Sequence, residues 1–380
     1  MNTRCPPKRV PSAVRFFTLC RLTVLLPQSY SVGGQRSSGQ LTGKPAGARP
    51  DTQGSLVRDI SSRATYCYIL LALAGLTASV FILITFIRGC KGRKRLTKMD
   101  TFFFALSLSD LFIILYSISV IAHRPGYLKT TSLNCGVFLF FFNISYFNSQ
   151  FLQVTMLFFL TFEENRPGVA LLIKALDNAL ACVGLTALGS FLGSVFMTAL
   201  LETGQQLNES LCCQLDPLQA GPRYDIAKFI VGIALPCLLL TLLLVKCLLL
   251  WKKSETGMSL AARLKACSAF LAVASVTLVC RIFYNAVLLH RTTLKYGLGS
   301  FSPQQEALGN VAELVMFAGS CLSLVLIVSL HKLCREGMVK TLTSLTDLCR
   351  RNRQGRDSQE YHDTHHRDRR AQRGNCVAAL

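Results

Sequence analysis

Seven long runs of apolar residues, separated by short connections that hold most of the charge, run through the 380-residue sequence. A helix needs about 20 apolar residues to cross a hydrocarbon core of roughly 30 Å, since it rises about 1.5 Å per residue. Backbone N–H and C=O groups find no water in lipid, so a spanning run must be helical. The sequence therefore predicts an all-α membrane protein, a seven-transmembrane helix bundle whose helices cover residues 66–87, 102–122, 136–161, 179–201, 226–250, 266–290 and 308–330.

Composition disfavours the other classes of protein. Only 16% of the residues are charged, whereas an ordinary soluble domain has about a quarter. The formal net charge of +21 could suggest a nucleic-acid partner, but the basic residues lie between the apolar runs, which predicts a lipid bilayer as partner and no nucleic acid. No nucleophile motif, metal-ligand cluster or phosphate-binding loop accompanies the runs, so we do not expect an enzyme. A transporter is less favoured, because no inverted repeat with broken helices is visible in the sequence.

The charges of the connections predict the orientation in the membrane. Twelve Lys and Arg residues follow the first, third and fifth runs, against five in the other three connections. Cytoplasmic loops are enriched in these residues, so we expect the N-terminus outside and the C-terminus inside, with the protein at the plasma membrane. The sequon at Asn208 then lies in an outer loop, where it can be glycosylated. A second sequon, at Asn143, falls inside the third run, out of reach of the transferase.

The two ends of the chain read as separate segments. Residues 1–64 are rich in Pro, Gly, Ser and Arg and are expected to be a disordered basic extracellular tail; an over-extended gene model and an organelle transit peptide are the alternatives. The bundle covers residues 65–331. Residues 332–350 predict an amphipathic interfacial helix, and residues 351–380 a disordered basic cytoplasmic tail. The palmitoylation candidates beside that helix are Cys334 and Cys349.

Several anchor residues resemble those of the rhodopsin-like (class A) G-protein-coupled receptors. Cys135 stands at the start of the third run, and the following outer loop holds the adjacent pair Cys212 and Cys213. The second run contains a Leu-x-x-x-Asp motif that ends at Asp110, and Pro236 matches the proline of the fifth helix. The segments that look most like galanin-receptor-like orphan receptors are Leu235-Pro236, Leu314–Phe317 and Cys334–Gly337.

The family's activation motifs are mostly replaced. When the third run is aligned from Cys135, Phe159-Leu160-Thr161 stands in place of Asp-Arg-Tyr. In the sixth run Arg281 stands in place of the family's Trp, and in the seventh run Ser323–Ile327 stands in place of Asn-Pro-x-x-Tyr. The resemblance thus leaves two functions open. One is a receptor that transduces an extracellular ligand to a heterotrimeric G protein. The alternative is a non-signalling or decoy receptor that keeps the anchors of the fold and lacks coupling.

The resemblance also implies a ligand site at the outer end of the bundle. Phe142 stands where aminergic receptors carry an Asp, and Phe317 where opsins carry the retinal Lys. The ligand is therefore expected to be a peptide or lipid rather than an amine or retinal. The residues expected to line the site are Phe138, Phe142, Asn143, Tyr284, Asn285, His290 and Glu313.

In the middle of the membrane the resemblance places oxygen-bearing side chains around Asp110, namely Ser149, Ser320 and Ser323. They can hold a structural sodium ion, and no other cofactor is expected. Two interpretations of Arg281 stay open: it points into the bundle and pairs with Asp110 or Glu313 in place of the ion, or it faces a watery vestibule without a specific partner. The resemblance further implies a disulfide from Cys135 to the outer loop; Cys213 is favoured and Cys212 is the alternative.

Overall fold

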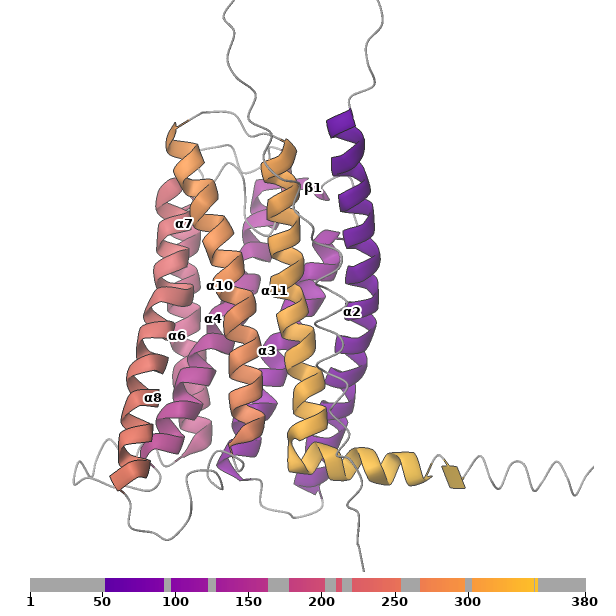
Figure 1. The fold of residues 1–380 in the computed structure, drawn as a ribbon, viewed down its shortest axis with the longest axis vertical. Coiled ribbons are helices and arrows are strands. Elements are labelled where there is room, and N and C mark those ends of the chain that lie inside the picture. Colours follow the sequence, from indigo (N-terminus) through magenta and orange to yellow (C-terminus); the bar gives the residue numbers. More distant parts are fainter. Residues whose placement is uncertain are drawn as a thin grey trace, which may run out of the picture. The chain divides into compact units, whose positions relative to one another are not determined.

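The computed structural model describes residues 52–91, 97–121, 128–162, 178–201, 210–213, 221–253, 267–297, 303–344 and 346–347. Seven of its helices are long and apolar enough to cross a membrane, which confirms the predicted seven-helix bundle (Figure 1). They are α2 (Thr52–Lys91), α3 (Lys98–Ile121), α4 (Ser132–Phe162), α6 (Ala179–Ala199), the continuous run of α7 (Pro222–Phe229), η1 (Ile230–Ala234) and α8 (Leu235–Lys253), α10 (Ser268–Gly297) and α11 (Pro303–Leu330).

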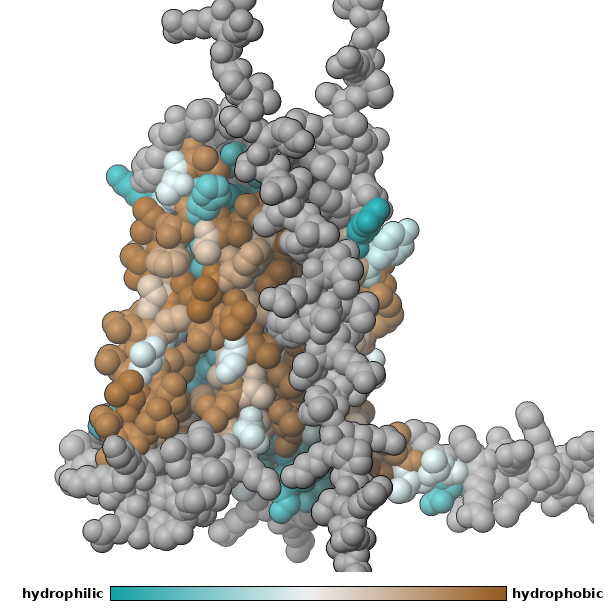
Figure 2. Space-filling view, in the orientation of Figure 1, coloured by the Kyte–Doolittle hydropathy of each residue, from teal (hydrophilic) through white to brown (hydrophobic). Residues whose placement is uncertain are grey.

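The helices pack side by side, with α4 in contact with α3, α6 and α8, and α11 in contact with α2, α3 and α10. α3, α4 and α11 bury the largest share of their residues, whereas α6 and the α7–η1–α8 run present most of theirs to the exterior. That exterior is apolar, as the brown surface in Figure 2 shows. A bilayer accepts such a surface, so polar side chains are left for the interior of the bundle.

The first helix begins earlier than predicted. α2 starts at Thr52, so the predicted boundary at residue 65 falls inside a continuous helix. Residues 52–64 contain no proline, and a nucleated helix extends at small free-energy cost. The expected disorder is therefore corrected for residues 52–64, while the predictions for residues 1–51 lie outside the described part of the chain.

A short two-stranded ribbon was not predicted. β1 (Leu128–Thr131) pairs antiparallel with β2 (Ser210–Cys213), so that Leu128 lies opposite Cys213 and Thr131 opposite Ser210. Strands of four residues between helix ends carry too few positions to show an alternating pattern. The ribbon joins the connection before α4 to the connection before α7.

The fifth membrane helix contains a π-turn, η1, directly before Pro236. The backbone N–H of Leu235 bonds to the carbonyl of Ile230, five residues earlier. A π-turn inserts one residue into the helix, and proline, which lacks an N–H, is a common neighbour of such irregular turns. The extra residue rotates α7 by about 100° relative to α8, which helps to turn Tyr224 and Lys228 toward the interior.

Gly232, within the π-turn, allows the close approach of α4. A Cβ atom at this position would lie 2.7 Å from Tyr146 Cε1 and 3.3 Å from Phe147 Cε1. We expect Gly232→Ala to lower the free energy of unfolding by about 1–3 kcal/mol, the usual cost of overpacking. Thermal unfolding of the purified protein measures this, with Gly184→Ala as control, where a Cβ meets nothing within 4 Å. Equal stability of the two variants would contradict the packing described.

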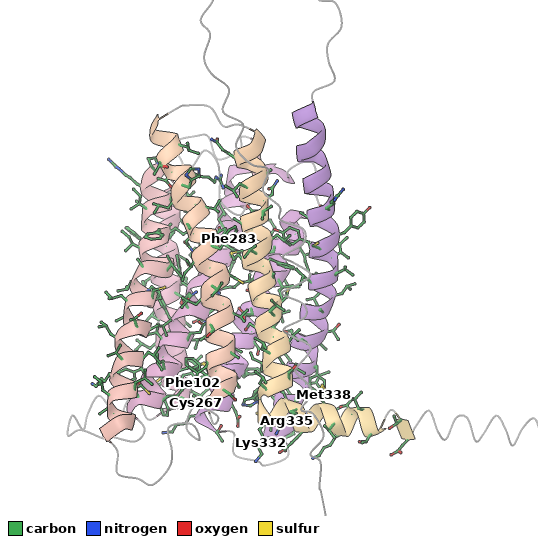
Figure 3. The ribbon with its side chains drawn as sticks, in the orientation of Figure 1. Phe102, Cys267, Phe283, Lys332, Arg335 and Met338 are labelled. Carbon is green, nitrogen blue, oxygen red and sulfur yellow. The ribbon has the colours of Figure 1, made fainter. Side chains whose placement is uncertain are left out.

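The predicted interfacial helix is present over residues 332–344 and turns sharply away from α11 (Figure 1). Lys332 and Arg335 are exposed on one side of it, and Met338 lies on the side toward the bundle (Figure 3). Residues 348–350, including Cys349, lie outside the described chain. Cys334 is fully buried, and burial raises the pKa of its thiol to about 12, so palmitoylation at this position is not supported.

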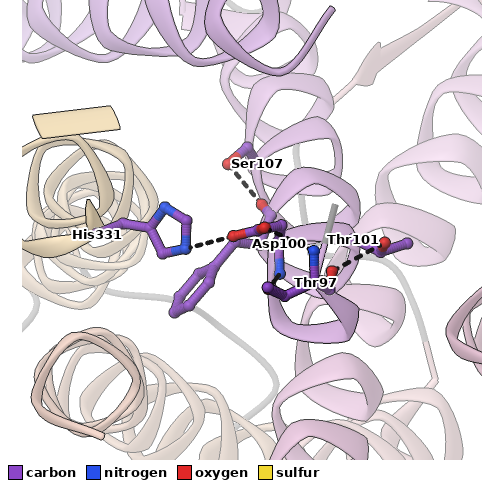
Figure 4. Close-up of polar contacts among 6 residues, drawn as sticks. Thr97, Asp100, Thr101, Ser107 and His331 are labelled. Atoms are coloured by element: carbon purple, nitrogen blue, oxygen red, sulfur yellow. Dashed lines mark hydrogen bonds and ion pairs between the residues drawn. The ribbon is translucent and has the colours of Figure 1, made fainter. Parts of the chain in front are cut away.

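His331 stabilises the corner between α11 and this helix through contacts with α3. Its Nε2 lies 3.0 Å from Asp100 Oδ1 of α3, and its ring packs 4.8 Å from that of Phe103 (Figure 4). Asp100 and Thr97 also form a capping box: Thr97 N donates to Asp100 Oδ2 at 2.8 Å, and Asp100 N donates to Thr97 Oγ1 at 3.2 Å. The first turn of α3 thus holds the end of α11.

Candidate functional site

Ionisable side chains buried within the helices mark the candidate site. An intramembrane charge is costly in free energy and is retained where it has a partner or a function. The sequence analysis identified three of the buried charges and missed the other three, which lie in α7 and near the C-terminal end of α10. Apart from His331, the described residues contain three buried acidic and three buried basic side chains: Asp110, Asp225, Glu313, Lys228, Arg281 and Arg291.

Arg281 of α10 points into the bundle and binds α4. Its Nη1 donates to the backbone carbonyl of Tyr146 at 2.7 Å, and its Cζ lies 4.5 Å from the centre of the Tyr146 ring. With the Gln150 amide oriented to suit its neighbours, Gln150 Oε1 accepts from Arg281 Nη1 at 3.0 Å and from Nε at 3.1 Å. We call these three residues the Arg281 clamp. With 1% of its surface exposed, Arg281 does not face a watery vestibule, which corrects that interpretation.

Asp110 of α3 lies beside the clamp. Its Oδ1 accepts from Ser149 Oγ at 3.2 Å, and Ser320 and Ser323 of α11 are close enough to influence the carboxylate electrostatically. The structure thus brings together the four residues that the sequence analysis grouped. Among the described residues, Arg281 interacts electrostatically with Asp110 without a direct salt bridge, and Glu313 is not one of its partners.

Three polar atoms of this region have no hydrogen-bond partner within the described chain: Asp110 Oδ2, Ser323 Oγ and Arg281 Nη2. Buried polar atoms of this kind are commonly satisfied by water or an ion. The donor set of one carboxylate and three hydroxyls fits a hard cation such as sodium. The guanidinium nearby already supplies a positive charge to the same carboxylate, and a second cation is disfavoured there.

A sodium comparison tests this competition between cations. We expect the melting temperature of the wild-type protein to agree in sodium chloride and potassium chloride of equal concentration. Arg281→Trp removes the internal cation, and sodium at ten times its Kd would then stabilise the variant by about 1.4 kcal/mol. If wild type and variant respond equally to sodium, Arg281 does not replace the ion.

Toward the end of the bundle at which α7 begins, aromatic rings surround the ammonium group of Lys228. Its Nζ lies 5.3 Å from the ring centre of Phe142, 5.6 Å from Tyr146, 5.8 Å from Tyr224 and 5.7 Å from Tyr284. We call these four rings the aromatic cage. Nζ also lies 3.4 Å from Tyr284 Oη, and Lys228 has no exposed surface. An ammonium in this setting is stabilised by the negative faces of the rings.

Amide side chains orient the rings of the cage. Asn143 Nδ2 donates to Tyr224 Oη at 3.4 Å. Asn285 Nδ2 donates to Tyr146 Oη at 2.6 Å and to the carbonyl of Arg281 at 2.8 Å. Asn285 therefore contacts both the cage and the residue that forms the clamp.

The predicted ligand-site residues divide into two groups. Phe142, Asn143, Tyr284 and Asn285 gather at the cage, as described above. Phe138 instead packs against Tyr116 of α3 at a ring distance of 6.4 Å, His290 is exposed, and Glu313 is buried on α11.

Other polar groups of the same half of the bundle link α7, α10 and α11. Thr292 Oγ1 of α10 donates to Asp225 Oδ2 of α7 at 3.1 Å. Arg291 of α10 lies against Gly309 of α11, where a Cβ atom would be 3.4 Å from its Nη1. These contacts connect α10 to α7 and to α11 in the part of the bundle that holds the cage.

Tyr146 connects the two regions. The centre of its ring lies 5.6 Å from the ammonium of Lys228 and 4.5 Å from the guanidinium of Arg281, and its own carbonyl accepts from the guanidinium. The sequence analysis did not single out Tyr146, because a tyrosine in an apolar run usually packs in a core. A signal for Lys228 was present: it is a charged residue within the predicted span 226–250.

The remaining site predictions fall partly outside the described residues. Cys135 is disulfide-bonded. Cys213 lies in β2, whose side chains are not described, and Asn208 lies in the undescribed segment before it. Within the described ranges, no group of three His, Cys, Asp or Glu side chains could hold a metal ion. This finding does not bear on a site made of one carboxylate and several hydroxyls, such as that around Asp110.

Comparison with known proteins adds no family. No protein-family model matches the chain, and a search of curated proteins found no match. The side chains described above are therefore the basis for the functional proposal.

Proposed function

We propose that this protein is a G-protein-coupled receptor of the rhodopsin-like type, which transduces an extracellular peptide or lipid ligand to a heterotrimeric G protein. The observation that supports this most is the connection through Tyr146, from a polar and aromatic cluster near the outer end to a buried clamp between α10 and α4. A ligand can change the conformation of a bundle only by binding one arrangement better than another. The structure has the clamp closed, and a ligand that binds better when the clamp is broken would loosen α10 from α4.

The proposal includes an orientation and a location. The N-terminus lies outside, the C-terminus lies in the cytoplasm, and the protein resides in the plasma membrane, as the distribution of Lys and Arg favours. Asn208 then carries a glycan, Cys135 bridges to Cys213 or Cys212, and Cys349 is a palmitoylation candidate. The pairing of β1 with β2 supports the bridge, because it brings the backbone around residues 212–213 to the segment before α4.

The alternative, a non-signalling receptor, also has specific support. At the inner end of α4, where the family has charged residues, Leu160 packs in the main apolar cluster, and the Phe159 ring lies 5.8 Å from that of Phe102. Such packing offers no polar switch to a G protein. The Arg281 clamp also favours this alternative, because it holds α10 against α4.

G-protein activation without added ligand distinguishes the two functions. The surface-expressed wild type is compared with Leu160→Arg, which restores the family's missing arginine, and with Leu342→Arg, a matched change at an exposed position of the interfacial helix. Basal activity of the wild type supports a signalling receptor. A silent wild type with an active Leu160→Arg variant supports the non-signalling receptor. Silence of all three at equal surface expression counts against the signalling receptor and shows that the missing arginine is not the cause of the silence.

A further inference from the structure

The aromatic cage has the chemistry of an ammonium-binding site. Its rings come from two different helices and from α7, so that Lys228 Nζ has ring centres on several sides at 5.3–5.8 Å. Cages of this composition recognise ligands that carry an alkylammonium group, through cation–π attraction in a desolvated setting. The hydroxyl of Tyr284, 3.4 Å from Nζ, adds a polar contact on one side.

The cation in this cage belongs to the chain itself. Lys228 extends from α7, the same helix that supplies Tyr224, and reaches the rings of α4 and α10 with its side chain fully buried. A tethered group has a high effective concentration at its site, so a free amine in solution competes poorly with it. The cage is therefore closed to external ammonium ions as long as Lys228 is present.

We propose that the aromatic cage is a binding site for alkylammonium cations that Lys228 occupies as an internal ligand. The occupancy of the site by Lys228 goes beyond the receptor function and does not depend on it. Its consequence for signalling, that the bundle is held in an occupied state without an external amine, does rest on the proposed receptor function.

The surroundings fit an internal ligand better than an incidental buried lysine. Asn143 and Asn285 hold the hydroxyls of Tyr224 and Tyr146, which fixes the ring planes around the ammonium. Gly232 lets the Tyr146 ring approach without a clash. An aliphatic core would need none of these polar contacts.

Chemical rescue tests the proposal. Lys228→Ala removes the three methylenes and the ammonium beyond Cβ, so n-propylammonium replaces the lost atoms. We expect n-propylammonium chloride to raise the melting temperature of the purified full-length variant and to bind at least about tenfold more tightly than 1-propanol, which has the same length without the charge. The wild type and Lys246→Ala, a change at an exposed lysine of α8, should show no such rise.

Two results would overturn the proposal. Equal rescue by n-propylammonium and 1-propanol would mean that only volume is restored, and absence of rescue in a folded variant would mean that the cage does not select ammonium. Neither readout involves a G protein, so failure here is separate from failure of the receptor function.

A second measurement covers the case in which Lys228→Ala does not fold. In the wild type, Lys228 should react with an amine-modifying reagent far more slowly than Lys332, which is exposed on the interfacial helix. Tyr284→Leu, which removes one ring and its hydroxyl, should raise the labelling of Lys228 toward that of Lys332. Rapid labelling of Lys228 in the wild type, or no change in Tyr284→Leu, would contradict an occupied cage.

Discussion

Arg281→Gln is expected to lower the free energy of unfolding by about 3–5 kcal/mol, because it leaves buried hydrogen-bond acceptors and a buried carboxylate without the cation that they face. The variant loses the guanidinium contacts with the Tyr146 carbonyl and the Gln150 amide, and it leaves Asp110 buried without its nearby cation. Thermal or chemical unfolding of the purified protein measures the change. Arg335→Gln, on the exposed side of the interfacial helix, is the matched control and should change stability by no more than about 0.5 kcal/mol.

Two further variants separate the charge of Arg281 from its shape. Arg281→Lys keeps the charge and loses the planar fork that reaches two acceptors, so part of the loss should remain. Arg281→Gln combined with Asp110→Asn removes both charges, and the double variant should be less destabilised than the sum of the single variants by about 0.5–3 kcal/mol. Additive effects would show that Arg281 and Asp110 are not coupled, and an Arg281→Gln variant as stable as Arg335→Gln would show that the clamp contributes nothing.

Tyr146→Ala should have an effect of similar size, about 3–5 kcal/mol, because it removes a fully buried aromatic ring. The ring packs against those of Phe142 and Tyr284, and it faces both buried cations. Tyr146→Phe is the control. It keeps the ring and loses the 2.6 Å bond from Asn285 to the hydroxyl, which should cost about 1 kcal/mol.

The comparison of these two Tyr146 variants isolates the ring from its hydroxyl. If both variants are equally stable, the Tyr146 ring does not hold the cage and the clamp together. The proposed connection between the cage and the clamp is then wrong. Unfolding curves of the two variants measured in the same detergent are sufficient for this test.

The helices of this protein were predictable because a bilayer imposes a simple requirement. A span must be long, apolar and helical, so the seven runs followed from the sequence alone. The limits of the helices did not follow: outside the hydrocarbon core a helix can continue through polar residues, as α2 does from Thr52. The ribbon of β1 and β2 was equally invisible, because it depends on two connections that meet only in the folded chain.

The site residues were predictable where the family resemblance implied their positions along the helices. They were not predictable where contacts between helices determine the partner of a side chain. Asp110 and its three serines lie together as their positions in the motifs implied. Arg281 was expected either to pair with Asp110 or Glu313 or to face a watery vestibule, yet its direct acceptors are a carbonyl and an amide of α4. Which acceptor a flexible arginine reaches depends on packing between helices, which no pattern along one helix records.

The missed residues share a different cause. Asp225 and Arg291 lie outside or at the edge of the predicted spans, where charges normally face water, and the structure buries both. Lys228 lies within a predicted span, but its role depends on four rings from three helices. Sequence alone reveals such a cage only after the helices have been placed relative to one another.

Hydrogen exchange tests most directly the central claim, that Arg281 holds α10 against α4. Backbone exchange in these two helices is compared between the wild type, Arg281→Gln and Arg335→Gln in the full-length protein. A loss of about 3 kcal/mol predicts local exchange on the order of a hundredfold faster around residues 146–150 and 277–285 in Arg281→Gln, with α6 unchanged and Arg335→Gln like the wild type. Unchanged exchange in α10 and α4 of Arg281→Gln would contradict the claim.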